Sequence, residues 1–457
     1  MSRALLSLCL LGSMGCAEYG MRGGVGVTAG GSQDMGLARA LIEDGQVPAR
    51  HQFAAEGLFS EHDLPLDGDV CTELLCPRAA ATVHRPLDGG DDKVLVQLGF
   101  GTSITADSFA RPDLDLALLV DVSCSMSDGK LKISKDGVQR LLQELDEDDF
   151  VSLVEFGSRA KLRQARVRMD EAGRQKMENA VQRLSIGGST DMESGMRKAY
   201  EQLDDDPELS ARLLVFTDAQ PNTGVTDDSA FVSLVRGQAD EGVGTTLLGT
   251  GTDLGSGLAN ALGKVRGGNY YYVDEDSVER VFTDEFDFMV TPLAYDMEAT
   301  LVSLEGVSLG DDVYGAPIDG DAVKLGASTL FPSSRNGGMA ATFDIVPDGP
   351  VGLGTLRVVY VPVGATEPVS QSLAVGWEGG VYRDEADDLG VYKIAVLVDE
   401  YKAMLAAAEV MEGLRTAEEA IVIVSATEER LQAMATDLDD EQLAQEALLM
   451  QLLADNL

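Results

Sequence analysis

Apolar and polar positions follow a repeating order between residues 113 and 290. Predominantly apolar runs at 114–120 and 150–156 indicate strands that are buried on both faces. Between such runs, apolar residues recur at helical spacing, as at Leu131, Val138 and Leu141. Strands that alternate with helices are typical of a parallel sheet with crossover helices. The pattern therefore predicts an α/β domain over residues 113–290.

The pattern changes after residue 290. Glycines and prolines separate short β-type runs across residues 291–382, which predicts an antiparallel, sandwich-like β domain. The run at 93–100 alternates in character and is a candidate strand of the same β structure. Residues 383–457 are expected to be helical, with apolar stripes near their end. Packing on the β domain is the expected role of these stripes, and a partner-binding helix is the alternative.

The first residues carry a targeting pattern. Arg3 precedes an apolar core at 4–11, and small residues then lead to Cys16, which is typical of a secretory signal. Residues 1–16 resemble a bacterial lipoprotein signal, and this resemblance implies that Cys16 is lipidated. Ordinary cleavage without a lipid is the alternative. Ala17 is not the Asp that retains many such proteins at the inner membrane, so outer-membrane attachment is expected.

Two further segments precede the α/β domain. Residues 17–32 are rich in glycine and predict a flexible tether. Residues 33–112 begin with a short helical pattern that Gly45 and Pro48 end. Beyond the signal, no apolar stretch approaches the roughly 20 residues that span a bilayer. The membrane is therefore expected to hold the chain through the N-terminal lipid only.

The large excess of acidic residues argues against one class of partner, the nucleic acids. The chain has 35 Lys and Arg against 77 Asp and Glu, a formal net charge of −42. Such a surface repels phosphate backbones, so nucleic acid is not an expected partner.

Cys71 and Cys76 form a close pair in a chain that is expected to be exported. Export favours a disulfide across a small loop. A zinc site that adds His51, His62 or His84 is the competing interpretation, although scattered histidines lack the usual ligand spacing.

Oxygen-bearing side chains gather where buried strands end. Asp121, Ser123 and Ser125 follow the run at 114–120, and Asp218 ends a second buried run. Thr190 lies in a glycine-containing loop between them. Ligands of open α/β sheets bind at the carboxyl ends of the strands. Hydroxyl and carboxylate oxygens suit Mg²⁺, with Ca²⁺ or Mn²⁺ as alternatives, better than a soft metal.

These residues resemble the metal-ion-dependent adhesion site of von Willebrand factor A domains. The layout also resembles inter-α-trypsin-inhibitor heavy chains and bacterial von Willebrand A lipoproteins. The resemblance implies a Rossmann-like α/β fold over residues 113–290, with an additional β-rich domain and a helical C-terminal region.

The resemblance also implies roles for the site residues. Ser123 and Ser125 would bind the ion directly, Thr190 directly or through water, and Asp121 and Asp218 mainly through waters. An open position would accept an Asp or Glu side chain of a partner. Cys124 and Ala219 stand where relatives commonly carry Gly, which bears on the metal affinity. Asp191 either supplements the site or caps the following helix.

A catalytic role is not expected. All three histidines precede residue 85, and the His-Glu-x-x-His and phosphate-loop motifs do not occur. The sequence predicts a non-enzymatic, metal-dependent adhesion module of the bacterial cell envelope. Its partner would be an envelope or extracellular protein that presents Glu or Asp. The alternatives are a constitutive structural envelope scaffold with a non-functional or purely structural metal site, and an A domain of an ATPase assembly.

Overall fold

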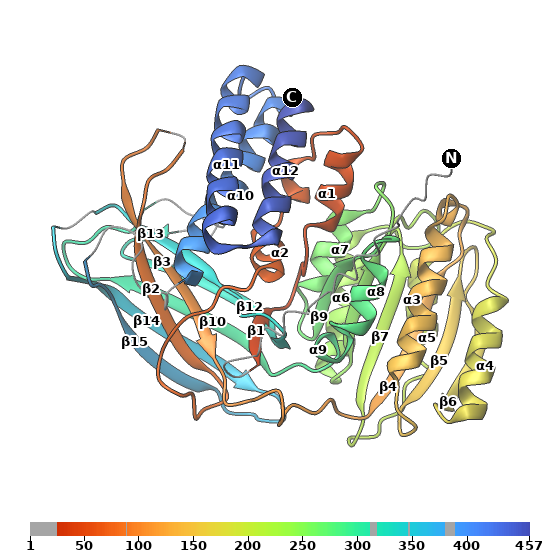
Figure 1. Ribbon diagram of the computed structural model, residues 1–457. Helices are drawn as coiled ribbons and strands as arrows, with labels where there is room; N and C mark the ends of the chain where they lie inside the picture. The colour runs from red at the N-terminus through yellow and green to blue at the C-terminus, as the bar shows by residue number, and fades with distance from the viewer. Residues whose placement is uncertain (1–24, 88, 311–317, 346–347, 380–388) are drawn as a thin grey trace, which may run out of the picture.

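The computed structural model falls into an α/β region, a β-rich region and a group of helices (Figure 1). It describes residues 25–87, 89–310, 318–345, 348–379 and 389–457. The expected signal at 1–16, with Cys16, lies outside the described residues. In the part of the chain that is described, no helix is both long enough and apolar enough to cross a membrane.

The α/β region is built on a six-stranded sheet with the order β6-β5-β4-β7-β8-β9. Its neighbours pair in parallel except β6, which runs antiparallel to β5 at one edge. The parallel sheet expected over residues 113–290 is therefore confirmed. The strands are β4 (Leu114–Asp121), β5 (Phe150–Phe156), β6 (Lys161–Arg168), β7 (Ser210–Thr217), β8 (Gly244–Gly249) and β9 (Gly268–Tyr272).

Helices cover both faces of this sheet, which explains why its central strands are predominantly apolar. In β4, Leu116, Leu118 and Val120 join the core on one face, whereas Ala117 and Leu119 join the core on the other. The first face packs against α3 (Lys130–Glu144), α4 (Glu171–Gln182), α8 (Val278–Thr283) and α9 (Phe286–Met289). The second packs against α5 (Met192–Tyr200), α6 (Asp228–Asp240) and α7 (Ser256–Gly263).

The β-rich region consists of two antiparallel sheets around one apolar core. One sheet has the order β1-β12-β10-β14-β15, with β11 beside β12, and the other has the order β13-β3-β2. The strands are β1 (Gly26–Ala29), β2 (Cys76–His84), β3 (Lys93–Gly101), β10 (Ala294–Ser303), β11 (Ile318–Asp319), β12 (Ala322–Ser333), β13 (Met339–Phe343), β14 (Val351–Pro362) and β15 (Val369–Trp377).

The sandwich draws on more of the chain than residues 291–382. The strand expected at 93–100 is β3, and it pairs with both β2 and β13. The expectation of a flexible tether over 17–32 is wrong for its described end. Val25 and Val27 are buried, and Gly26 of β1 pairs with Ser333 of β12. These valines bury apolar surface in the core, which offsets the entropy lost on ordering the glycines.

Helices lie between the two regions and above them (Figure 1). They share one apolar core, to which Leu95 of β3 and Ala340 of β13 also belong. Leu431 and Leu453 are fully buried there, so the C-terminal apolar stripe serves packing, although Leu448 is 57% exposed. The helices are α1 (Gly36–Glu43), α2 (Ala55–Glu61), α10 (Leu389–Met411), α11 (Ala417–Leu438) and α12 (Glu441–Asp455), with a 3-10 turn at Arg50–Gln52.

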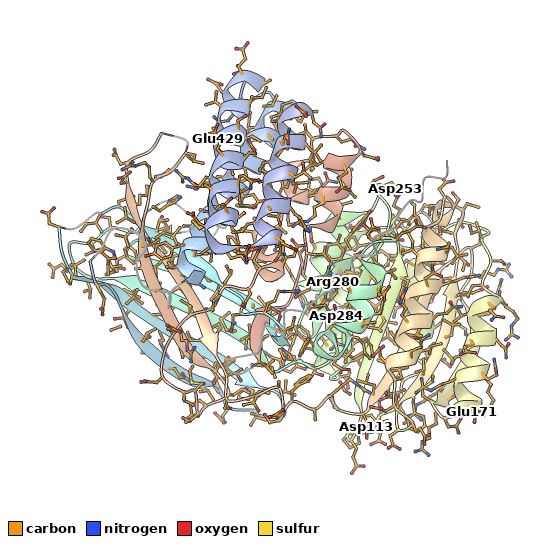
Figure 2. The ribbon with its side chains drawn as sticks, viewed as in Figure 1. Asp113, Glu171, Asp253, Arg280, Asp284 and Glu429 are labelled. Atoms are coloured by element: carbon orange, nitrogen blue, oxygen red, sulfur yellow. A yellow bond between two sulfur atoms is a disulfide. The ribbon has the colours of Figure 1, made fainter. Side chains whose placement is uncertain are left out.

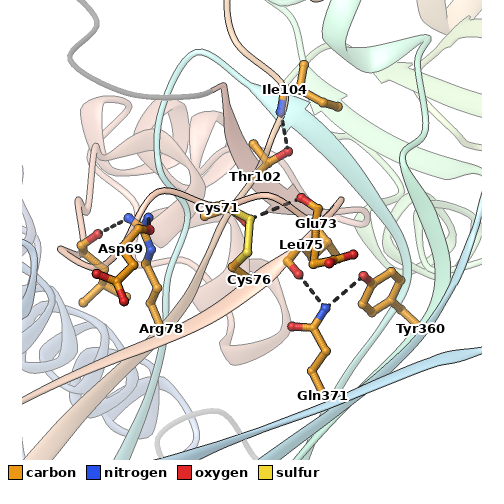
Figure 3. Close-up of a disulfide and its surroundings, with 12 residues drawn as sticks. Asp69, Cys71, Glu73, Leu75, Cys76, Arg78, Thr102, Ile104, Tyr360 and Gln371 are labelled. Atoms are coloured by element: carbon orange, nitrogen blue, oxygen red, sulfur yellow. Dashed lines mark hydrogen bonds between the residues drawn. A yellow bond between two sulfur atoms is a disulfide. The ribbon is translucent and has the colours of Figure 1, made fainter.

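Cys71 and Cys76 form the expected disulfide, at the entry to β2 (Figure 3). Gln371 of β15 ties the same loop to the opposite sheet, because its Nε2 donates to the Leu75 carbonyl at 2.7 Å. The zinc interpretation fails, since His62 and His84 pair instead with carboxylates of the C-terminal helices. The disulfide therefore closes a loop that the sandwich core also holds.

Candidate metal centre

The five predicted residues lie at one edge of the α/β sheet, where β4 and β7 end. Asp121 is the last residue of β4, and Asp218 directly follows β7. Since Val120 and Phe216 are partners in the parallel ladder, the two carboxylates leave the sheet at nearly the same level. Ser125 lies in the 3-10 turn Cys124–Met126, and Thr190 precedes α5. The topology thus brings together residues from three loops.

Asp121 is completely buried and bonded through both oxygens. Its Oδ1 accepts from the Ser123 backbone N–H, and its Oδ2 accepts from the Thr217 hydroxyl, each at 2.8 Å. Burial raises the pKa of Asp121 to about 6, and the nearby charge of Asp218 adds to this shift. The Oγ atoms of Ser123 and Ser125 lie 2.9 Å apart. Two hydroxyls and one carboxylate are therefore fixed relative to each other.

Thr190 is held by a residue that the sequence analysis did not identify. Asn222 accepts from the Thr190 backbone N–H at 2.9 Å and donates from Nδ2 to Thr190 Oγ1 at 3.2 Å. Its position in the loop after β7 is the sequence signal that could have identified it. Asp191 caps α5 by accepting from the Ser194 N–H at 3.3 Å. Of the two roles considered for Asp191, the helix cap is the one that the structure contains.

Asp218 is buried, and only one of its two carboxylate oxygens has a hydrogen-bond partner among the described residues. Its Oδ2 accepts from Lys130 Nζ at 3.1 Å, whereas its Oδ1 has no hydrogen-bond partner among the described residues. Lys130 also pairs with Asp253, which lies in the loop after β8 (Figure 2). Burial works to lower the pKa of Lys130, but its contacts with Asp253 and Asp218 outweigh burial and raise it. Lys130 is a second residue that the sequence analysis did not identify.

This donor set fits a hard divalent cation. A buried carboxylate oxygen without a donor is costly, and a cation beside Asp218 Oδ1 would remove that cost. Within the described ranges, no three His, Cys, Asp or Glu side chains group as metal ligands. The site instead mixes hydroxyls with carboxylates, which Mg²⁺ accepts and soft metals do not favour. Lys130 already supplies one positive charge to this mixture.

Ala219 and Cys124 stand where the resembling domains commonly carry glycine, and the structure shows the surroundings of both. Ala219 has a φ of 51°, in the left-handed region where glycine is favoured. A side chain there costs about 1 kcal/mol. Its N–H donates to Thr217 Oγ1 at 3.0 Å, which helps to hold this conformation. Cys124 is exposed, and its N–H donates to the Gly188 carbonyl at 3.0 Å. Neither substitution displaces the predicted ligands from the site.

The chain is similar in part to known proteins. Uncharacterized protein YfbK of Escherichia coli (strain K12) is 27% identical over 195 residues, which cover 42% of this chain and 34% of that protein. Inter-alpha-trypsin inhibitor heavy chain H1 of Sus scrofa is 28% identical over 244 residues, 48% of this chain and 27% of that one. The similarity thus spans about a third or less of these relatives.

Similarity extends to a solved structure and to a family profile. The von Willebrand factor type A protein from Catenulispora acidiphila has a TM-score of 0.49 at 14% identity, covering 82% of this chain and 90% of that one. Residues 116–220, which contain all five predicted site residues, match the model of the von Willebrand factor type A domain family. Residues 116–220, in the α/β region, therefore belong to a von Willebrand factor type A (VWA) domain.

Proposed function

We propose that this chain is a non-enzymatic binding protein whose VWA domain holds a Mg²⁺ ion that captures an Asp or Glu side chain of a partner. Ser123, Ser125 and Thr190 would hold the ion, with Asp121 and Asp218 beside it. The observation that carries this proposal is the buried Oδ1 of Asp218, for which the described residues offer no donor. Bound Mg²⁺ would supply the positive charge that attracts the incoming carboxylate.

The proposal extends to the cellular setting. The signal pattern at 1–16 favours export and outer-membrane attachment through Cys16. The partner would then be an envelope or extracellular protein with an accessible acidic residue. Ca²⁺ or Mn²⁺ could replace Mg²⁺, because both accept the same oxygen donors.

A second candidate function is a constitutive envelope scaffold with a purely structural metal site. Lys130 favours it, because this lysine already neutralises part of the charge of Asp218. The two candidates differ in one respect: only the adhesion function makes binding depend on the free position of the ion.

Affinity capture from an envelope extract separates the two candidates. The chain is immobilised and exposed to extract in Mg²⁺ or in EDTA. Asp121→Ala tests the site, and Asp276→Ala, an exposed acid in the loop after β9, is the matched control. We expect a protein that the wild type and the control retain only in Mg²⁺, and that Asp121→Ala does not retain. Equal retention in EDTA and by Asp121→Ala would contradict adhesion and support the scaffold.

A further inference from the structure

A cavity of about 190 Å³ lies inside the β-rich region, between its two sheets. Strands β1, β10 and β12 line it from one sheet, and β3 with the residues that lead into β13 line it from the other. Helix α2 contributes at the side. The cavity shares no residue with the candidate metal centre, so the VWA function does not account for it.

Most side chains that line the cavity are apolar, and Thr28, Ser60, Glu56 and Lys324 are its polar lining residues. Leu98, Met297 and Leu330 line it while being at most 3% exposed, and Leu325 and Ala327 complete the wall on β12. None of the described side chains around it has a buried polar atom without a hydrogen-bond partner. A water molecule needs two to four polar partners to be stable in a cavity. Water inside this one is therefore easily displaced by an apolar group.

The walls are held apart by hydrogen-bonded strands. Leu98 lies on the middle strand of its sheet, paired with Ala79 of β2 and Met339 of β13. Leu330 of β12 is paired on both sides, with Ala29 of β1 and Ala294 of β10. A single strand cannot move into the space without breaking its ladder, which limits collapse of the cavity. The space is therefore preformed.

The entrance carries no excess charge. Lys324 pairs with Glu298 at 3.4 Å, and Glu56 pairs with Lys264 at 3.3 Å. A charged ligand would have to break one of these pairs, and the net charge of −42 opposes an anion in any case. The entrance therefore favours an uncharged molecule.

We propose that this cavity is a binding site for a small uncharged apolar molecule, of the size of one aromatic ring or a short branched hydrocarbon chain. An apolar protein cavity of about 150 Å³ holds benzene, so the volume here is sufficient. Binding would replace poorly bonded water with contacts to Leu98, Met297 and Leu325.

Toluene is a suitable probe, and methionine methyl groups are suitable reporters. Met297 and Met339 line the cavity, whereas Met126 lies at the metal centre and Met404 in the helical core. In the full chain labelled with ¹³C at the methionine methyls, toluene should shift the Met297 and Met339 resonances saturably. The Met126 and Met404 resonances should not move, and they report on the fold of each variant.

Ala327→Leu should fill the cavity and weaken toluene binding at least tenfold. Ala374→Leu is the matched control, because Ala374 is exposed on β15 of the same sheet, and it should bind as the wild type does. If Ala327→Leu disturbs the fold, Ala327→Val tests the same point and should weaken binding less. Unsaturable shifts in the wild type, or unchanged affinity in a folded Ala327 variant, would overturn the proposal.

Discussion

Two buried groups of charged residues can be compared, the candidate metal centre and an ionic cluster beneath the C-terminal helices. The ionic cluster consists of Arg39, Glu61, His62 and Glu446. Arg39 donates to the two oxygens of Glu446 at 2.7 and 2.8 Å and also pairs with Glu61. His62 Nε2 lies 3.1 Å from Glu446 Oε1. Burial favours protonation of Glu446, but Arg39 and His62 outweigh it and hold the pKa of Glu446 well below its usual range.

The two groups differ in the source of the positive charge that neutralises their carboxylates. In the ionic cluster Arg39 supplies it to both Glu61 and Glu446, and these ion pairs join α1, α2 and α12. At the metal centre, Asp218 Oδ1 has no donor among the described residues, and burial raises the pKa of Asp121 instead. Lys130 pairs with Asp218 Oδ2 only, so the metal centre keeps a buried carboxylate oxygen that a cation could contact.

Glu400, which lies beside the ionic cluster, is a third kind of buried carboxyl group. Both of its oxygens lack hydrogen-bond partners among the described residues. Burial, and then the charge of Glu446, raise the pKa of Glu400 well above its usual range. Burial therefore favours the protonated, uncharged form of the Glu400 carboxyl group.

The largest effect is expected from Arg39→Ala. It would leave Glu446, which is 0% exposed, as a buried charge without its arginine. We expect a loss of about 3–5 kcal/mol in the free energy of unfolding, measured by urea titration. Arg50→Ala is the control, because the Arg50 side chain is 42% exposed and its ion pairs should contribute less than about 1 kcal/mol. Similar losses in both variants would contradict the structural role of the cluster.

The metal centre should gain stability from its cation. At a Mg²⁺ concentration 100-fold above the Kd, binding should stabilise the wild type by about 2.7 kcal/mol. Asp121→Ala should abolish this gain, which thermal unfolding with and without Mg²⁺ measures. Arg39→Ala should keep the gain, since it does not touch the site. An equal rise in Tm for Asp121→Ala would exclude the proposed site.

Asp34, which lies beside Glu61 of the ionic cluster, should make the free energy of unfolding depend on pH. Burial, and then the charge of Glu61, raise the pKa of Asp34 from 3.8 to about 7. The folded chain therefore binds this proton more tightly than the unfolded chain does. The resulting stability is complete below about pH 4 and is lost by about pH 7, at about 1.4 kcal/mol per pH unit.

Asp34→Asn isolates this effect. The single Asn oxygen can still accept from both the Gly36 and Tyr272 N–H groups, because Asp34 Oδ1 accepts from them at 3.0 and 3.3 Å. We expect the unfolding free energy of the wild type, relative to the variant, to fall between pH 4 and 7 and to level off above. A difference that does not change with pH would show that Asp34 is charged in the folded state.

The smallest effect is expected from Lys130→Met. Removing the ammonium group beside Asp218 should tighten Mg²⁺ binding by about 1 kcal/mol, or about fivefold, because two cations no longer compete. Isothermal titration measures this change. Lys132→Met, at a side chain that is 65% exposed, should bind Mg²⁺ as the wild type does. Weaker binding by Lys130→Met would mean that Lys130 mainly positions Asp218.

The VWA region could be predicted from the sequence because its strands are buried on both faces. Such strands are continuous apolar runs, and the residues that follow them meet at one edge of the sheet. Asp121 and Asp218 were found in this way. Asn222 and Lys130 were missed, since an amide in a loop and a lysine at a helix start carry no periodic signal.

The β-rich region could be predicted only in part. The strand at 93–100 alternates in character, but its partners β2 and β13 lie on opposite sides of the VWA domain in sequence. Strand β1 was missed because its glycines suggest a tether, and only its pairing with β12 makes it a strand. Long-range pairing of this kind leaves no trace in local composition.

The pairing of Gly26 with Ser333 also has a consequence for folding during synthesis on the ribosome. Ribosomes add about 5–20 residues per second, so on the order of 15–60 s separates the synthesis of β1 from that of β12. The whole VWA domain emerges during this interval. Until β12 has been synthesised, the backbone N–H and C=O groups of β1 have no partner strand. During this time β1 is exposed to pairing with a strand of another copy of the chain.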